Sequence, residues 1–354
     1  MKPYLDSDIL EIVHRLGGQV ERFSGCSILL TGGHGFLGSH YTAFFRYLNE
    51  HILPKPCALI VLDNHITSSP PDSDLSRWEG YRFVHHDVTQ PFASDVPLDY
   101  IIHAAGIASP YHYSRHPLET LEVSTLGTKN LLALGTLHKL KGFLYFSSSE
   151  IYGDPDEKHV PTSESYRGNV SCLGPRACYD EAKRLGETLC FIFHRLYGVP
   201  LKIVRPFNVY GPGMSATDYR VLPGFASRVV GGKPLDVYSS GKQTRTFCYV
   251  TDALVGFFRV LLDGHPGEVY NIGNPAPEIS ILELASVLER VMDRTLEVRF
   301  TGYPDAYPAD EPQRRCPDIR KAALQLDYRP CVGLEEGLGR FMGWALKNYA
   351  ACPP

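Results

Sequence analysis

The sequence predicts an α/β protein in which helices cover both faces of a parallel sheet, followed by a smaller lobe. Between Cys26 and Arg205, short apolar segments alternate with longer stretches of helical periodicity, which is typical of βαβ units. From Pro206 onward, proline and glycine interrupt the chain at short intervals. The 354 residues suffice for two domains, or for one large α/β unit with an appended lobe.

Each expected element follows from a local pattern. Residues 5–16 place Ile9 and Ile12 on one helical face, and Asp6 or Ser7 provides an N-cap. Apolar strands are expected at 27–31, 58–62, 81–85, 100–103, 142–147 and 201–205, with helices after Gly38, near 117–139 and near 179–197. The expected domains are an N-terminal helix within 1–24, a main domain over 25–205, and a lobe over 206–354 from which some segments return to the main domain.

The charge balance excludes several kinds of partner. The chain has 35 Lys and Arg against 39 Asp and Glu, a net charge of −4, so no broad positive surface is available for nucleic acid or an anionic membrane. No apolar stretch approaches the roughly 18–20 residues of a membrane span, and the first residues lack the apolar core of a signal peptide. We therefore expect a cytoplasmic protein that binds neither nucleic acid nor membrane.

The cysteines and histidines do not indicate a metal site. Nine cysteines form an odd, scattered set without a C-x-x-C pair, so reduced thiols are expected rather than disulfides or a zinc ribbon. The run His85-His86-Asp87 follows Phe83 and Val84 as the end of a strand. No metal is predicted.

A glycine-rich turn indicates a dinucleotide site. An apolar strand from Ile28 leads through Gly32, Gly35 and Gly38 into a helix, and glycine there lets backbone N–H groups approach a pyrophosphate. The next apolar strand ends at Asp63, an acidic residue placed to accept hydrogen bonds from a ribose and to repel a 2′-phosphate. The sequence therefore predicts a Rossmann-type domain that prefers NAD to NADP.

A second pattern indicates acid–base chemistry. Tyr179 and Lys183 are four residues apart and share one helical face, where the ammonium favours the phenolate. Taken alone, such a pair is more often a surface feature. Upstream, however, the strand over 142–146 ends in Ser147-Ser148-Ser149-Glu150, which places hydroxyls and a carboxylate at the edge of the sheet where ligands bind.

Together these motifs resemble the extended short-chain dehydrogenase/reductase superfamily, whose members act on nucleotide-sugars with tightly held NAD. Within it, the chain is most similar to the UDP-glucuronate decarboxylase (UDP-xylose synthase) group. The matching stretches are 149–155, 174–184, 243–247, 310–315 and 317–319. The chain departs from that group at Glu122, Gly213 and Ser215, where Lys, Arg and His are expected.

The resemblance implies roles for individual residues. Tyr179 would be the base, Lys183 its electrostatic partner and a ligand of the nicotinamide ribose. Ser148 or Ser149 would hydrogen-bond the reacting C4 oxygen, while Glu150 and Arg245 would orient or protonate groups near C5. The implied NAD ligands are Gly32, Gly35, Phe36, Leu37, Gly38, Asp63, Asn64, Asp87, Val88, Ala104, Ala105 and Gly106, together with Tyr179 and Lys183. The implied nucleotide-sugar ligands are Tyr113, Asn208, Arg220, Tyr238, Arg245 and Arg315. The guanidinium groups of the three arginines match pyrophosphate oxygens.

The implied reaction converts UDP-glucuronate to UDP-xylose by C4 oxidation, loss of CO₂ and re-reduction. A 4,6-dehydratase, a 4-epimerase and a non-catalytic NAD-sensing protein stay open as alternatives. Dehydratases of this superfamily use an adjacent Asp-Glu pair, whereas Ser149 precedes Glu150 here. The resemblance also implies a homodimer in which the helices near 117–139 and 179–197 form a four-helix bundle, with Leu189, Ile192 and Phe193 as apolar surface.

Overall fold

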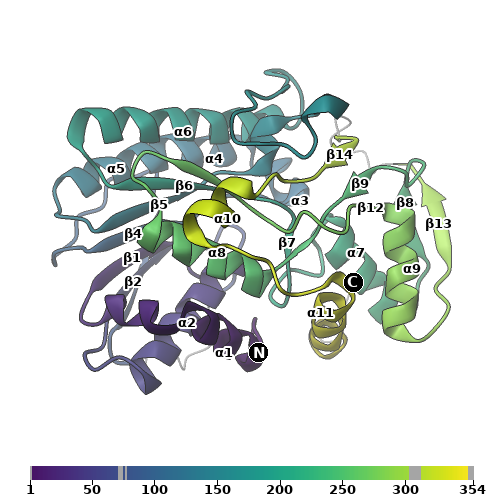
Figure 1. Cartoon of the computed structure of the whole chain (residues 1–354), viewed down its shortest axis with the longest axis horizontal. Coiled ribbons are helices and arrows are strands. Elements are labelled where there is room, and N and C mark those ends of the chain that lie inside the picture. Colours follow the sequence, from purple (N-terminus) through teal and green to yellow (C-terminus); the bar gives the residue numbers. More distant parts are fainter. Residues whose placement is uncertain (1, 71–74, 76–77, 303–311, 350–354) are drawn as a thin grey trace.

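A parallel sheet forms the main body of the protein (Figure 1). The computed structural model describes residues 2–70, 75, 78–302 and 312–349. Within these ranges seven parallel strands are ordered β11-β6-β5-β4-β1-β2-β3, which confirms the predicted fold class. They are β1 (Ser27–Thr31), β2 (Ala58–Asp63), β3 (Tyr81–His85), β4 (Tyr100–His103), β5 (Gly142–Phe146), β6 (Leu201–Pro206) and β11 (Val269–Ile272). The winding direction reverses between β1 and β4, and ligands bind at such a switch point.

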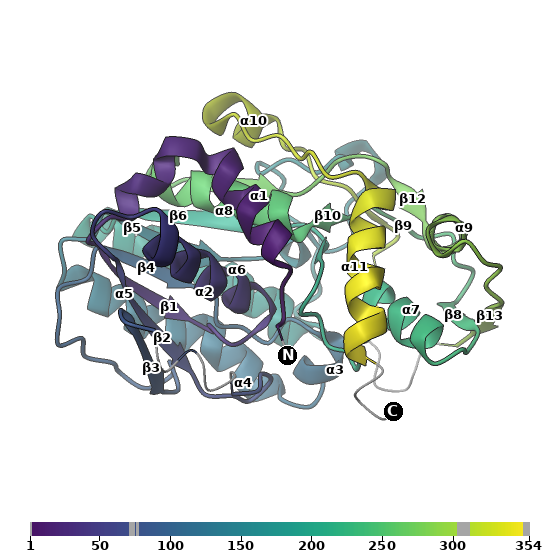
Figure 2. The same ribbon diagram turned by 90° about the horizontal axis from the view of Figure 1, so that it is seen from below.

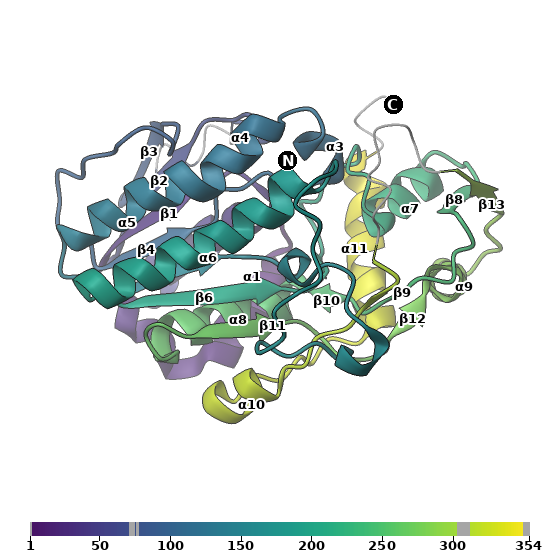
Figure 3. The same cartoon turned by 90° about the horizontal axis from the view of Figure 1, so that it is seen from above.

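Helices cover both faces of this sheet (Figures 1 and 3). One face carries α4 (Pro117–Glu122), α5 (Thr128–Thr136) and α6 (Ala177–Tyr197), and the other carries α1 (Asp6–Leu16), α2 (Phe36–His51) and α8 (Val250–Asp263). Successive side chains of a strand point to opposite faces. Ile28 and Leu30 therefore join one buried cluster and Leu29 the other, which explains why the strand is apolar throughout.

The second lobe lies beside the carboxyl ends of the strands (Figures 1 and 2). Its elements are β7 (Val209–Tyr210), α7 (Val221–Val230), β8 (Leu235–Tyr238), β9 (Thr244–Arg245), β10 (Cys248–Tyr249), β12 (Ile279–Ser280), α9 (Ile281–Met292), β13 (Val298–Thr301), β14 (Arg314–Arg315) and α11 (Leu334–Asn348). Further short helical segments include α3 (Pro110–Tyr113), the π-helical turn Val123–Gly127 between α4 and α5, and α10 (Arg320–Leu326). After residue 206, α8 and β11 return to the main sheet, where β11 pairs with β6.

Two expectations about helix starts are wrong. The N-cap of α1 is Leu5, because Asp6 is already helical and its carboxylate is engaged by Lys2 at 2.8 Å. Helix α2 begins at Phe36 rather than after Gly38. Gly38 lies inside the helix, where a Cβ would be 2.1 Å from the carbonyl oxygen of Gly32, so its missing side chain lets the helix reach the turn.

Some sequence features lie outside the described ranges. These are Asp310 and Glu311 of the 310–315 stretch, and Cys352. No helix within the described part of the chain has the length and apolar character that a membrane span requires.

Candidate active site

A cavity of about 760 Å³ opens at the carboxyl ends of β1, β2, β4 and β5, between the sheet and the second lobe. Every candidate ligand or catalytic residue expected from the sequence lines it, except Tyr238. Tyr238 ends β8, where it pairs with Thr301 of β13 at the outer side of the second lobe (Figure 1). The expectation that Tyr238 binds substrate is therefore not supported, because the strand carries it away from the cavity.

The glycine-rich turn forms one end of the cavity. Gly32 has a φ of +70°, and a Cβ there would lie 2.7 Å from the Cα of Ala105. The turn is therefore pressed against the segment after β4. The N-cap of α2 is Gly35, which has no side chain to cap the first N–H groups of the helix. Uncapped N–H groups at a helix N-terminus facing a cavity fit the pyrophosphate of NAD.

Asp63 is fixed beside this turn. Its carboxylate accepts hydrogen bonds from the backbone N–H of His34 (3.0 Å) and His65 (2.9 Å) and from the hydroxyl of Ser68 (2.9 Å). Burial lowers the pKa of His34 to about 4, although Asp63 opposes this shift, so the imidazole is neutral at pH 7. A 2′-phosphate would thus meet the Asp63 carboxylate without a compensating charge from His34.

We expect Asp63→Asn to narrow the preference for NAD over NADP by about tenfold, because the substitution removes the charge that repels a 2′-phosphate. Calorimetric titration with both dinucleotides measures this. Asp87→Asn is the matched control: Asp87 also lines the cavity, but it bonds Asn64 and Thr89. It should change both affinities equally. Wild-type binding of NADP as tight as that of NAD would contradict the assignment.

Helix α6 carries the pair Tyr179 and Lys183 to the edge of the sheet. The helix packs closely against β5 at Gly186, where a Cβ would be 2.0 Å from the hydroxyl of Tyr145. The Lys183 ammonium donates a hydrogen bond to the carbonyl of Phe146 (2.8 Å) and lies 5.8 Å from the Tyr179 ring centroid. Both side chains are buried and line the cavity.

Burial shifts the pKa values of the two groups in opposite directions. Burial lowers the pKa of Lys183 to about 8, against the opposing effect of Cys190 and Glu187. Burial also raises the pKa of the Tyr179 phenol, and a hydrogen bond from Ser148 opposes that rise. Tyr179 therefore needs a nearby cation to act as a base at neutral pH, and Lys183 is placed to supply it.

Glu150 is held by two arginines beside these residues. Arg176 and Arg315 both form ion pairs with its carboxylate, the second at 3.1 Å. Arg315 also donates to the carbonyls of Ser149 and Gly153, so its guanidinium lies at the Glu150 end of the cavity. The sequence reasoning assigned no role to Arg176, although it stands in the matching 174–184 stretch.

Arg220, which also lines the cavity, is fixed by an aspartate. Arg220 donates to the Asp218 carboxylate through Nε (2.9 Å) and a terminal nitrogen (2.6 Å), and Ser109 donates to the other carboxylate oxygen (3.1 Å). Asp218 and Ser109 line the cavity and were also missed, since no motif marks them. The side-chain amide of Asn208 donates to the carbonyl of Thr246 (2.8 Å), which joins the residue before β7 to the residue after β9.

Comparisons of sequence identify a family. Residues 28–273 match the NAD dependent epimerase/dehydratase family. The chain is 40% identical over 317 residues to UDP-glucuronic acid decarboxylase 1 from Arabidopsis thaliana, covering 89% of this chain and 68% of the relative. It is also 40% identical over 324 residues to UDP-glucuronic acid decarboxylase 1 from Xenopus tropicalis, covering 91% and 72%.

Solved structures show the same fold with NAD bound. A dTDP-glucose 4,6-dehydratase from Streptomyces venezuelae, solved with NAD, superposes with a TM-score of 0.78 at 26% identity, covering 91% of this chain and 97% of that one. A UDP-glucuronic acid 4-epimerase from Bacillus cereus, solved with UDP-glucuronic acid and NAD, gives a TM-score of 0.76 at 25% identity, covering 91% and 99%.

Proposed function

The chain belongs to the NAD dependent epimerase/dehydratase family, and we propose that it converts UDP-glucuronate to UDP-xylose, with NAD regenerated in each turnover. The observation that carries the proposal is the arrangement of Tyr179, Lys183 and Ser148 beside Glu150, all lining the cavity that begins at the glycine-rich turn. The chain is 40% identical to two UDP-glucuronic acid decarboxylases, and this identity supports the choice of substrate.

The chain's own residues have clear tasks in this reaction. NAD, which Gly32, Gly35 and Asp63 would hold, would supply the acceptor and then the donor of a hydride at sugar C4. Tyr179 accepts the proton of the C4 hydroxyl, Lys183 stabilises the phenolate, and Ser148 holds the C4 oxygen.

Decarboxylation then follows from the substrate's own structure. The C4 ketone is β to the C6 carboxylate, so the electron pair of the C5–C6 bond passes to the C4 oxygen as CO₂ leaves. A proton adds to C5 before C4 is reduced again. Glu150 with its two arginines, and Arg245, are the charged groups available to orient or protonate near C5.

The same geometry favours decarboxylation over dehydration. A 4,6-dehydratase must protonate a departing C6 hydroxyl, and Ser149 here occupies the position of the Asp in its Asp-Glu pair. The side chain of Glu150 is already bound by Arg176 and Arg315. A 4-epimerase uses the same Tyr and Lys, and the product distinguishes it.

Product masses test the proposed function directly. The purified enzyme is incubated separately with UDP-glucuronate, UDP-glucose and dTDP-glucose. We expect a product lighter by CO₂ from UDP-glucuronate and no change in the other two. Loss of water from a hexose would establish a dehydratase instead, and an isomer of unchanged mass from UDP-glucuronate would establish an epimerase.

The structure suggests where a homodimer would form. Helices α4 and α6 lie side by side on one face (Figure 3) and expose several large apolar side chains. These are Leu118, Leu121, Leu185, Phe191, Ile192 and Leu196. Two of the three residues expected in this role are placed differently: Leu189 and Phe193 are partly buried and pack against the core beneath α6. The exposed side chains still supply apolar surface on both helices for a twofold interface.

We expect the wild-type protein to sediment as a dimer at micromolar concentration, and Leu185→Glu to shift it to a monomer because a buried charge lacks a partner at a twofold contact. Leu324→Glu is the matched control, since Leu324 is 87% exposed on α10, away from these helices. A monomeric wild-type protein, or a Leu185→Glu variant that stays dimeric, would contradict this interface.

The cytoplasmic location expected from the sequence also stays a prediction.

A further inference from the structure

Residues Lys2, Pro3 and Tyr4, here called the N-terminal arm, line the cavity although they precede the part of the chain that matches the family. They share this wall with Phe36 and other residues of α2, beside the glycine-rich turn, and with the loop after β7. The arm thus lies where the main domain and the second lobe meet, close to the C-terminal half of α11 (Figure 2). Nothing in the motifs of the sequence predicted this position.

Contacts with both lobes hold the arm. The carbonyl of Lys2 accepts a hydrogen bond from the indole N–H of Trp344 on α11 (3.0 Å). The ring of Tyr4 meets that of His40 on α2 edge-on, with centroids 6.4 Å apart. The carbonyl oxygen of Pro3 lies 2.5 Å from where a Cβ of Gly213 would be, and Gly213 has a φ of +94°. A side chain at Gly213 would displace the arm.

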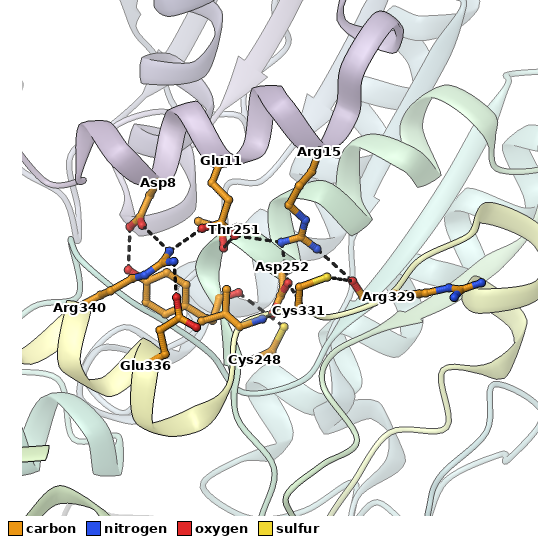
Figure 4. A network of polar contacts seen from close by, with 12 residues as sticks. Asp8, Glu11, Arg15, Cys248, Thr251, Asp252, Arg329, Cys331, Glu336 and Arg340 are labelled. Carbon is orange, nitrogen blue, oxygen red and sulfur yellow. Dashed lines mark hydrogen bonds and ion pairs between the residues drawn. The ribbon is translucent and has the colours of Figure 1, made fainter. Parts of the chain in front are cut away.

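Helix α1, which follows the arm, is tied down by a buried polar network (Figure 4). Asp8 is fully buried and accepts hydrogen bonds from the hydroxyl of Tyr249 (2.7 Å) and from Arg340 (3.2 Å). Burial raises the pKa of Asp8 to about 6, although both partners oppose the rise. Arg15 pairs with buried Asp252 at 2.7 Å. The start of α1, and with it the arm, is thereby fixed relative to α8 and α11.

The arm also brings a positive charge to the cavity. Lys2 and Arg46 of α2 both line it, and each has a carboxylate partner, Asp6 and Glu50 respectively. Arg46 lies ten residues along α2 from Phe36, so of the two cations only Lys2 belongs to the arm that passes the start of this helix. The Lys2–Asp6 pair is exposed to water and therefore weak, so the ammonium can exchange a carboxylate oxygen for a phosphate oxygen at little cost.

We propose that the N-terminal arm is an additional part of the dinucleotide site that retains bound NAD, with Lys2 as a charged contact for its pyrophosphate and Tyr4 as part of the cavity wall. Trp344 acts through the arm, because its indole holds the Lys2 carbonyl. The inference concerns the dinucleotide alone, so it holds or fails independently of which nucleotide-sugar is the substrate.

The test measures the dissociation constant and release rate of NAD for full-length Lys2→Gln, Tyr4→Ala and Trp344→Phe. We expect each variant to release NAD about three- to tenfold faster than the wild type. The effect of Lys2→Gln should shrink in 1 M salt (about 3 Å screening length), whereas that of Tyr4→Ala should persist. Lys2→Arg should restore retention.

The controls are Lys139→Gln, an exposed lysine on the surface after α5, and Tyr47→Ala, a half-buried tyrosine of α2 that does not line the cavity. Both should keep wild-type NAD affinity. Wild-type affinity and release in all three arm variants would overturn the proposal, and so would lowered melting temperatures with unchanged NAD binding. Neither result bears on the products formed from nucleotide-sugars, which test the proposed function separately.

Discussion

Tyr179→Phe is expected to lower the turnover number by roughly 10²–10⁴, the usual contribution of a positioned general base, while NAD and nucleotide-sugar still bind. The substitution removes only the phenol oxygen. The ring keeps its stacking on Tyr113, whose centroid lies 5.7 Å away at an interplanar angle of 15°. The first oxidation therefore loses its proton acceptor, whereas the shape of the cavity is retained.

The measurement is the release of CO₂ from UDP-glucuronate, with NAD and substrate affinities determined on the same preparation. Tyr113→Phe is the matched control, because it removes a hydroxyl from the adjacent tyrosine of the same cavity. We expect its effect to fall mainly on KM, as for a substrate contact, rather than on kcat. A Tyr179→Phe enzyme that released CO₂ at a near-normal rate would show that the base is misassigned.

Lys183→Met is expected to reduce turnover by about 10² or more at pH 7 and to regain part of the loss at high pH. Burial raises the pKa of Tyr179, and the Lys183 ammonium, 5.8 Å from the ring centroid, is close enough to favour the phenolate. Without that charge the phenol stays protonated to higher pH. The acid limb of the pH profile of kcat should therefore move to higher pH. Activity should recover at a pH where the phenol ionises without the lysine. Met is chosen to fill the buried volume that Ala would leave empty.

Lys202 offers a matched control for this experiment. Its ammonium also donates to a backbone carbonyl, that of Leu261 at 2.8 Å, and burial likewise lowers its pKa to about 8. It belongs to β6 and does not line the cavity. Lys202→Met should therefore leave the pH profile of kcat unchanged. A profile for Lys183→Met that keeps the wild-type acid limb would exclude the proposed electrostatic role.

The sequence by itself determined the sheet, the glycine-rich turn and the pairing of Tyr179 with Lys183. These features are local: a strand covered on both faces must be apolar throughout, as β1 is, and residues four apart on a helix share a face. The strands over 27–31, 81–85 and 100–103 accordingly have the predicted bounds.

Only the tertiary structure decided which charges meet in the cavity. Glu150 and Arg315 are 165 residues apart in the chain, and Ser109 and Asp218 are 109 apart. Such pairs are set by how the second lobe packs against the sheet, and no periodic pattern records them. The same packing places Tyr238 outside the cavity and the N-terminal arm inside it. Hydrophobic periodicity specifies which face of an element is buried, but the partner of a buried charge depends on where distant elements come to rest.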